Sequence, residues 1–271
     1  MVEGLRRVLR AAFAPLRGRD LSLHAAAITF YGAVAIVPVS LLALWLTGLV
    51  AGADRVRRLT GYAVDTLPAS IGADRAAAAL VEAGLRLSLA GSLAALLPAT
   101  LYGEGLRRSF VSLSGRADGG PAVGWRGRLL LLPALAVSPG LLLVLLLVLP
   151  AAARLLGRGG LASVGGIVVS FLAVWIVLSP IVIWLVRAVG PARPGWLASV
   201  LAGSFTAANL SGFMHGFVLF CSLPLDLGLP FGGFDQLGGT VAVALWLYLF
   251  HLVLLVGYAL TLVLDSGRPE V

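Results

Sequence analysis

The chain has 271 residues, of which 59% are hydrophobic and only 12% are charged, and its mean hydropathy is +1.01. A water-soluble single domain could not cover its surface with so few charged residues, so the composition excludes that class of protein. The formal net charge of +8 rests on arginine alone, because the chain contains no lysine. We interpret this charge as a signal for membrane topology with some affinity for anionic headgroups, and we expect no nucleic-acid binding.

The first 19 residues are predicted to form a cytoplasmic interfacial segment. Apolar residues and arginines are interleaved over residues 2–13, so a helix here has one apolar face and one basic face. Pro15 is expected to end that helix, because the proline ring clashes with the carbonyl four residues earlier. The alternative is an unstructured basic leader that only sets orientation.

Six apolar stretches follow, each of them long enough to cross about 30 Å of hydrocarbon, which takes about 20 helical residues. Backbone amides in lipid must find partners within their own segment, so these stretches are predicted to be helices. We expect an all-α bundle of six transmembrane helices over residues 20–265, followed by a cytoplasmic tail at 266–271. The expected spans are 21–50, 84–103, 129–151, 161–187, 196–221 and 237–264.

The connection between the first two expected spans, residues 51–83, is longer than a simple loop requires. Its second part, from Ala73 to Ala83, is rich in residues that favour a helix. We therefore predict at least one short helix there, resting on the outer face of the bundle.

The distribution of arginine predicts the orientation of the spans, because basic residues gather on the cytoplasmic side of a membrane protein. We predict a multi-pass protein of the cytoplasmic (inner) membrane with both termini in the cytoplasm. Thirteen of the 20 arginines lie on the side of the termini, at Arg6, Arg7, Arg10, Arg17, Arg19, Arg107, Arg108, Arg116, Arg126, Arg128, Arg187, Arg193 and Arg268.

Catalytic motifs are nearly absent from the chain. Phosphate loops and SxxK nucleophiles need a lysine, and no HExxH pairing occurs. The single cysteine, Cys221, excludes an intramolecular disulfide and a thiolate metal cluster. His24, His215 and His251 lie at three different depths of their spans, so they are not expected to share a metal ion. We therefore expect no enzyme, no cofactor and no metal.

Four polar or aromatic residues inside the spans are candidates for lining a functional cavity, namely Tyr31, Asn209, His215 and His251. The alternative for each polar residue is a hydrogen bond across a helix interface.

Small residues recur every four positions in the fifth span, at Ala208, Gly212 and Gly216. Such a stripe lets a neighbouring helix approach closely, and Asn209 beside it would then bond to that neighbour. We therefore predict that the fifth span is a central packing helix. Prolines interrupt four spans, among them Pro38 and Pro180, and each permits a kink that serves either a cavity or simple packing.

Several motifs, in order along the chain, resemble a known family. The segment from Asp20 to Tyr31, followed by Val34 to Pro38, contains a double alanine, an aromatic pair and a proline. Trp184 to Trp196, Phe234 to Gly239 and residues 245–260 continue the pattern. Together these motifs resemble the YihY/BrkB family of inner-membrane proteins over about residues 20 to 265.

The resemblance departs from the family pattern at Tyr102 to Gly105 and at Phe234 to Gln236. It implies a virulence or serum-resistance factor, in a family that has also carried a ribonuclease BN label. A nuclease needs clustered carboxylates or histidines to hold metal and activate water. The acids within the spans and cytoplasmic connections are essentially Glu104 and Asp118, so ribonuclease activity is not expected.

Two classes of function remain open. The first is a transporter or flippase-like protein that handles a lipid or another amphipathic envelope solute, with membrane lipids as its partners. The second is a non-transporting scaffold or envelope-integrity factor, and an intramembrane enzyme is the weakest alternative. A continuous cavity lined by Asn209, Tyr31 or His251 would favour transport, whereas a filled bundle would favour a scaffold. The sequence does not indicate the oligomeric state.

Overall fold

The structure is a computed structural model that describes residues 20–64, 72–115, 122–223 and 225–266. All regular elements in these ranges are helices, which confirms the predicted all-α class. The expected interfacial helix over residues 2–13 and most of the expected tail at 266–271 lie outside the described residues. The helices are α2 (Leu21–Ala51), α3 (Ala53–Val64), α4 (Ala73–Leu85), α5 (Leu89–Ser114), α6 (Val123–Leu156), α7 (Gly160–Trp184), η3 (Leu185–Val189), α8 (Trp196–Ser222), η4 (Leu229–Phe231) and α9 (Asp235–Ser266).

Local side-chain chemistry sets several helix boundaries. Asp20 caps α2, since its carboxylate accepts a hydrogen bond from the Leu23 amide at 3.0 Å. Ser88 caps α5 in the same way, accepting from the Gly91 amide at 3.0 Å. α2 ends at Ala51, and the residue after it is Gly52, whose φ of +87° suits glycine best.

Five segments are long and apolar enough to cross a membrane by length and composition, namely α2, α6, α7 with η3, α8 and α9. The expected span at 84–103 is wrong in its bounds, because α4 ends at Leu85 and a separate helix, α5, runs from Leu89 to Ser114. α5 continues through Glu104 and two arginines, and it is not among the five. Glutamate and arginine favour helices, so these charges do not end α5.

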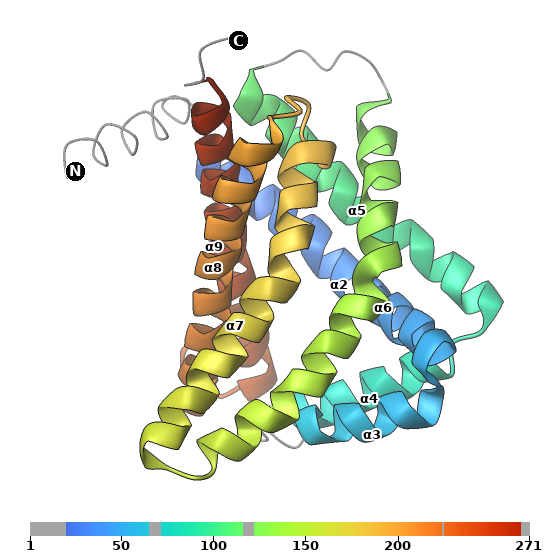
Figure 1. The fold of residues 1–271 in the computed structure, drawn as a ribbon, viewed down its shortest axis with the longest axis vertical. Coiled ribbons are helices and arrows are strands. Elements are labelled where there is room, and N and C mark those ends of the chain that lie inside the picture. The colour runs from blue at the N-terminus through green and yellow to red at the C-terminus, as the bar shows by residue number, and fades with distance from the viewer. Residues whose placement is uncertain (1–19, 65–71, 116–121, 224, 267–271) are drawn as a thin grey trace.

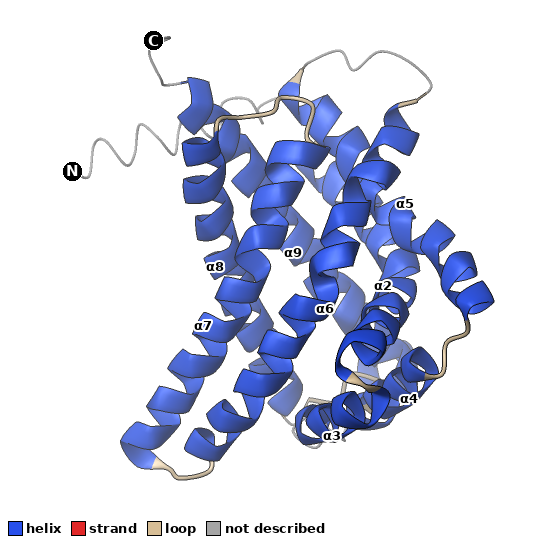
Figure 2. Ribbon diagram, turned by 45° about the vertical axis from the view of Figure 1, so that its right-hand side comes forward, coloured by secondary structure: helices blue, strands red, loops and turns tan. Residues whose placement is uncertain are grey.

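The long helices form a closed ring in which α2, α5, α6, α7, α8 and α9 each pack against the next and α9 returns to α2 (Figure 1). The start of α2 and the end of α9 lie at one end of the ring, together with the end of α5, the start of α6 and the α7–α8 connection. We call this the terminal end. α3 and α4 lie crosswise at the opposite end, which we call the α3–α4 end (Figure 2).

The prediction of a short helix within residues 51–83 is confirmed by α4, and α3 is a second helix in the same connection. α3 and α4 pack against α2, and α3 also contacts α6. Val56 of α3 is fully buried in a small cluster with Leu44 and Leu146. α3 and α4 therefore form a helical hairpin that is docked on the bundle.

The largest apolar core lies toward the terminal end. Phe110 of α5 and Tyr258 of α9 stack there with ring centroids 4.0 Å apart, and both are fully buried. Glycines bring the backbones close, and a Cβ added to Gly203 would lie 2.8 Å from Ile183. The helices at this end therefore approach each other closely, because glycine leaves room for the neighbouring helix.

Two of the noted prolines lie inside helices without ending them. Pro38 is half-buried in α2, and Pro180 is exposed in α7. One π-helical turn, η3, begins five residues after Pro180. A role for either proline in forming a cavity stays a prediction.

Candidate functional site

A buried histidine at the middle of α9 joins three helices. His251 is 3% exposed, and its Nδ1 lies 3.0 Å from Thr29 Oγ1 of α2 while its Nε2 lies 3.1 Å from the Tyr102 hydroxyl of α5. The Thr29 hydroxyl donates to the Ala25 carbonyl at 2.7 Å, so its oxygen accepts from Nδ1–H. Nε2 of the neutral ring then accepts from Tyr102. The three side chains form a directed chain of hydrogen bonds.

The surroundings of His251 leave it no open space. A Cβ added to Gly32 of α2 would lie 3.1 Å from His251 Cε1, so only glycine fits beside the ring without movement. Tyr31, the preceding residue, packs its ring against Gly105 of α5. Neither Tyr31 nor His251 lines the two cavities described below. In this structure both residues join helices.

His215 makes a second polar link, between α7 and α8. Its Nδ1 donates to the Ser211 carbonyl at 2.8 Å, and its Nε2 accepts from the Ser170 hydroxyl at 2.9 Å. Its ring lies 5.9 Å from the ring of Phe171. His215 therefore also serves as a helix-to-helix hydrogen bonder here, and it does not line the neighbouring cavity.

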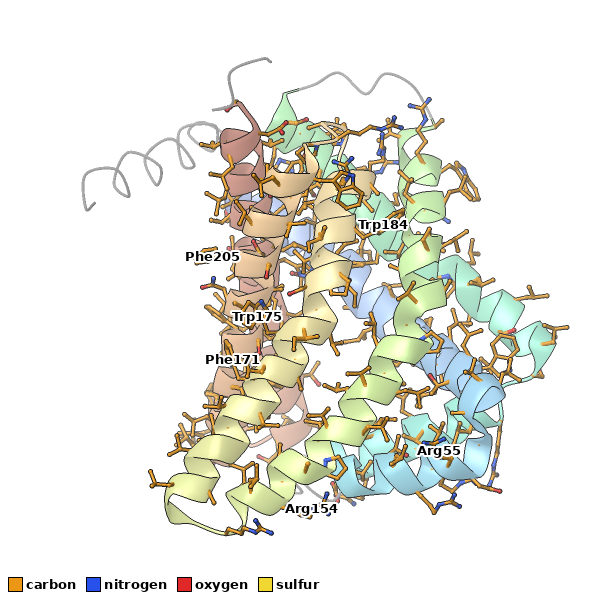
Figure 3. All side chains as sticks on the ribbon, in the orientation of Figure 1. Arg55, Arg154, Phe171, Trp175, Trp184 and Phe205 are labelled. Carbon is orange, nitrogen blue, oxygen red and sulfur yellow. The ribbon has the colours of Figure 1, made fainter. Side chains whose placement is uncertain are left out.

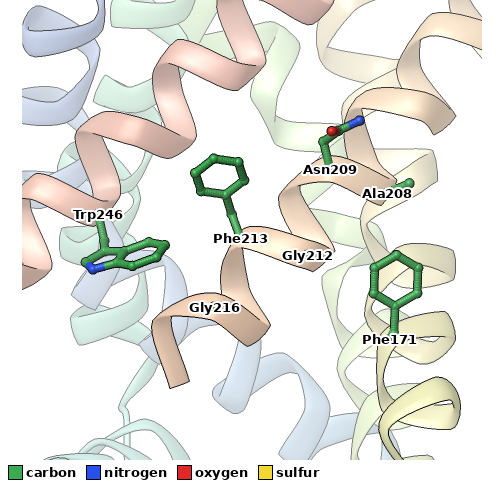
Figure 4. A pocket seen from close by; sticks show the side chains of 7 residues that line it. All are labelled: Phe171, Ala208, Asn209, Gly212, Phe213, Gly216 and Trp246. Atoms are coloured by element: carbon green, nitrogen blue, oxygen red, sulfur yellow. The ribbon is translucent and has the colours of Figure 1, made fainter. Parts of the chain in front are cut away.

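An open groove with a volume of about 560 Å³ runs along α8. Phe171 of α7 and Trp246 of α9 stand on its two sides, and Gly212 and Gly216 of α8 leave its floor without side chains (Figure 4). A Cβ added to Gly212 would have its nearest neighbour, Phe171, at 3.9 Å. The groove is lined by Phe171, Ala208, Asn209, Gly212, Phe213, Gly216 and Trp246.

The groove faces outward from the bundle. Gly212 shares a helical face with Leu201 and Phe205, which are 55% and 61% exposed. α8 is one of the five apolar segments, so large exposed apolar side chains on this face contact lipid when the helix spans a membrane.

Asn209 lies where the groove meets a second, smaller cavity of about 240 Å³ between α8 and α9. Its Nδ2 donates to the Phe205 carbonyl of its own helix at 2.8 Å, and the side chain is exposed. Asn209 is therefore the polar group at the centre of a furrow whose walls are otherwise largely apolar.

The predicted close packing of the Ala208–Gly212–Gly216 stripe against another helix is not found at Gly212, which is exposed, whereas a Cβ added to Gly216 would lie 3.4 Å from Trp246 of α9. α8 instead makes its close contacts through Gly203, which lies against Ile183 of α7, and through Thr206, which lies against Gly257 of α9. At 100° per residue Thr206 points inward when Gly212 points outward. The predicted bond from Asn209 to a neighbouring helix is replaced by its bond within α8.

A charged cluster near the terminal end was not predicted from the sequence. Glu104 of α5 accepts from Arg108 one turn later at 2.8 Å and from Arg128 of α6 at 2.7 Å. Arg107 is only 7% exposed and donates to the Val189 carbonyl at 2.8 Å. The sequence indicates Arg107 and Arg108 only as topology signals, because their partners lie on another element or one helical turn away.

Two exposed tryptophans accompany arginines at the same end. The Arg187 guanidinium lies 4.1 Å from the Trp196 ring centroid, and Arg128 lies 4.9 Å from that of Trp125. The tryptophans are 63% and 61% exposed, respectively. Exposed tryptophan beside arginine is typical of the level where a bilayer meets water.

Comparison with known proteins identifies one family. A sequence model of the family described as Virulence factor BrkB matches residues 12–270. No curated protein and no solved structure matches the chain. The matched range includes every described helix, and so it covers both the His251 junction and the α8 groove.

Proposed function

This chain belongs to the BrkB virulence factor family and is a multi-pass membrane protein, and we propose that it binds an amphipathic envelope lipid at the α8 groove and moves it between leaflets. The observation that carries the proposal is the groove itself, an open, largely apolar furrow on the outward face of a membrane helix. A lipid can enter such a furrow sideways from the bilayer without passing through water.

The chemistry of the lining suits an acyl chain. Phe171, Phe213 and Trp246 offer apolar walls, while Gly212 and Gly216 let a chain lie against the α8 backbone. The volume of about 560 Å³ falls within the range of about 300 to 1,000 Å³ that ligand sites occupy. Asn209 supplies a polar contact for an ester or hydroxyl group, because its carboxamide oxygen can accept a hydrogen bond.

We further propose that α5 is a sixth span and that the terminal end is cytoplasmic. α5 has 26 residues and lies in the ring beside α2 and α6, so it has the length to cross the bilayer with them. The excess of arginine at the terminal end supports a cytoplasmic location at the inner membrane. Reporter fusions at Gly119 and Gly232 should report cytoplasmic and external positions, respectively. The opposite pair of signals would reverse the orientation.

A scaffold is the second candidate, and the exposed Gly212 that opens the groove also supports it. Small residues on an outward face allow the helix of another protein to approach closely, and Asn209 could bond to it. In either case we expect the chain to work without a catalytic residue, a cofactor or a nucleic-acid partner, and these expectations stay predictions.

Filling the groove separates the two candidates. Gly212→Leu places a side chain in the groove without a close contact, and Gly140→Leu is the matched control because Gly140 is also exposed, has open space and lies on α6. In liposomes with a labelled phospholipid, we expect Gly212→Leu to lower the lipid movement rate severalfold and the control to leave it unchanged. Equal rates for wild type and Gly212→Leu would reject transport at the groove. If Gly212→Leu leaves lipid movement unchanged and changes only the binding of a co-purifying protein, the result would support the scaffold.

A further inference from the structure

The α3–α4 hairpin has one apolar side and one charged side. The apolar side faces the bundle, where Val56 is fully buried and Leu59 and Leu80 join the same cluster. Both helices lie crosswise at the end of the long helices (Figures 1 and 2). In a protein whose long helices span the bilayer, helices that lie crosswise at the end of these spans lie near the level of the lipid headgroups.

Two acidic residues of this hairpin form ion pairs with arginines of the same segment. Arg57 Nε donates to Glu82 at 2.6 Å, and Arg57 Nη1 donates to Asp54 at 2.8 Å. Arg86 lies 3.3 Å from the same Glu82 carboxylate. The hydrogen bond from Arg57 holds the pKa of Glu82 below its ordinary value, so this carboxylate stays charged and bound. Asp74 at the start of α4 is the remaining acid of the two helices.

Two other arginines of α3 are left available. Arg55 and Arg58 are exposed and lie on the charged face of α3, and neither has an ion-pair partner in the described ranges. Arg154, from the end of α6, adds positive charge at the same end of the molecule (Figure 3). The exposed charge that this hairpin turns away from the bundle is therefore mainly positive.

We propose that Arg55 and Arg58 bind the phosphate groups of anionic phospholipids in the leaflet that meets the α3–α4 end. A guanidinium can give two parallel hydrogen bonds to one phosphate, which makes arginine well suited to this headgroup. The charge complementarity and the crosswise position of α3 select a lipid surface as the partner. This interaction does not depend on the α8 groove, so it goes beyond the proposed function.

The test measures lipid preference in full-length protein. Native mass spectrometry in detergent compares the binding of phosphatidylglycerol and phosphatidylcholine to wild type, to Arg55→Gln/Arg58→Gln, and to Arg193→Gln. Arg193 is the control because it is exposed and lies in the α7–α8 connection at the terminal end. Each interfacial arginine contributes about fivefold to the binding of an anionic lipid surface. We expect the preference for phosphatidylglycerol to fall about 25-fold in the double variant and to stay unchanged in the control.

The outcomes are decisive in both directions. A double variant that keeps the wild-type preference would overturn the proposal, and so would full displacement of phosphatidylglycerol by an equal concentration of inorganic phosphate, since that marks a general anion site. Each single variant, expected to lose about fivefold, replaces the double variant if the latter does not fold. Gly212→Leu should keep the preference, which separates failure of this inference from failure of the groove proposal.

Discussion

The two ends of α9 are packed in opposite ways. Between His251 and Thr261 it buries seven residues against its neighbours, whereas before His251 only Gly238 is buried. Two glycines of α9 show the same difference in packing, because Gly257 lies directly against Thr206 whereas Gly239 has open space around it. The first half of α9 therefore leaves most of its surface for lipid or a ligand, while the second half is held by protein.

The difference shows where the molecule can change shape at low cost. Near the terminal end, moving a helix would break close backbone contacts and the stack of Phe110 on Tyr258. Beside the first half of α9, the α8 groove can accept a chain or a side chain without displacing backbone. The closely packed terminal end therefore holds the helices together, while the more open opposite half leaves room for a ligand at the α8 groove.

The sharpest test of this comparison replaces one glycine in each region. Gly257→Leu would force its side chain into Thr206, and we expect a loss of about 3 kcal/mol or more in the free energy of unfolding. Gly212→Leu should change it by less than about 0.5 kcal/mol, because its Cβ meets nothing closer than 3.9 Å. Thermal unfolding in detergent, with size exclusion to measure folded yield, compares the two. Equal losses would mean that the two regions are packed alike.

A smaller effect is expected at the charged cluster of the terminal end. Glu104→Ala removes the carboxylate that Arg128 binds, and both side chains are less than one fifth exposed. We expect a loss of about 2 kcal/mol, as for a hydrogen bond to a charged group. Arg108→Ala is the control, since Arg108 is 55% exposed and should cost about 0.5 kcal/mol. Chemical unfolding of both variants checks the ranking, and a larger cost for Arg108→Ala would reverse it.

The His251 junction should contribute less still. Tyr102→Phe removes only the hydrogen bond to His251 Nε2, and intramembrane bonds of this kind average about 0.6 kcal/mol. Tyr248→Phe on α9 is the control, because the Tyr248 hydroxyl makes no hydrogen bond within the described part of the chain. A double-mutant cycle of Tyr102→Phe with His251→Leu isolates the bond. A coupling energy near zero would show that the junction is held by packing alone.

The smallest effect concerns acid pH at the α3–α4 end. The pKa of Glu82 lies below its ordinary value of 4.5 because Arg57 binds the carboxylate, so the resulting stability is complete above that value. It is lost as the pH falls through the lower pKa of the folded state. We expect wild type to lose slightly more of its melting temperature than Glu82→Gln when the pH falls from 6 to about 3. Parallel curves for the two proteins would remove the Arg57–Glu82 pair as a pH-dependent contact.

The sequence by itself determined the class of protein and the position of most of its helices. Runs of about 20 or more apolar residues can be stable only as helices in lipid, and this physical requirement predicted α2 and α6 to α9. Helix-forming residues also predicted α4 within the long connection. These features depend on local composition, which the sequence contains directly.

Only the tertiary structure decided which face of each helix meets protein. α8 is apolar on nearly all sides, so periodicity does not identify its inward face, and the sequence alone predicts Gly212 as a packing residue although it faces outward. Glu104 of α5 is bound by Arg128, which lies 24 positions later. The partners of His251 lie 222 and 149 positions away. Contacts between residues so distant along the chain depend on the folded arrangement, because local sequence carries no record of which helices become neighbours.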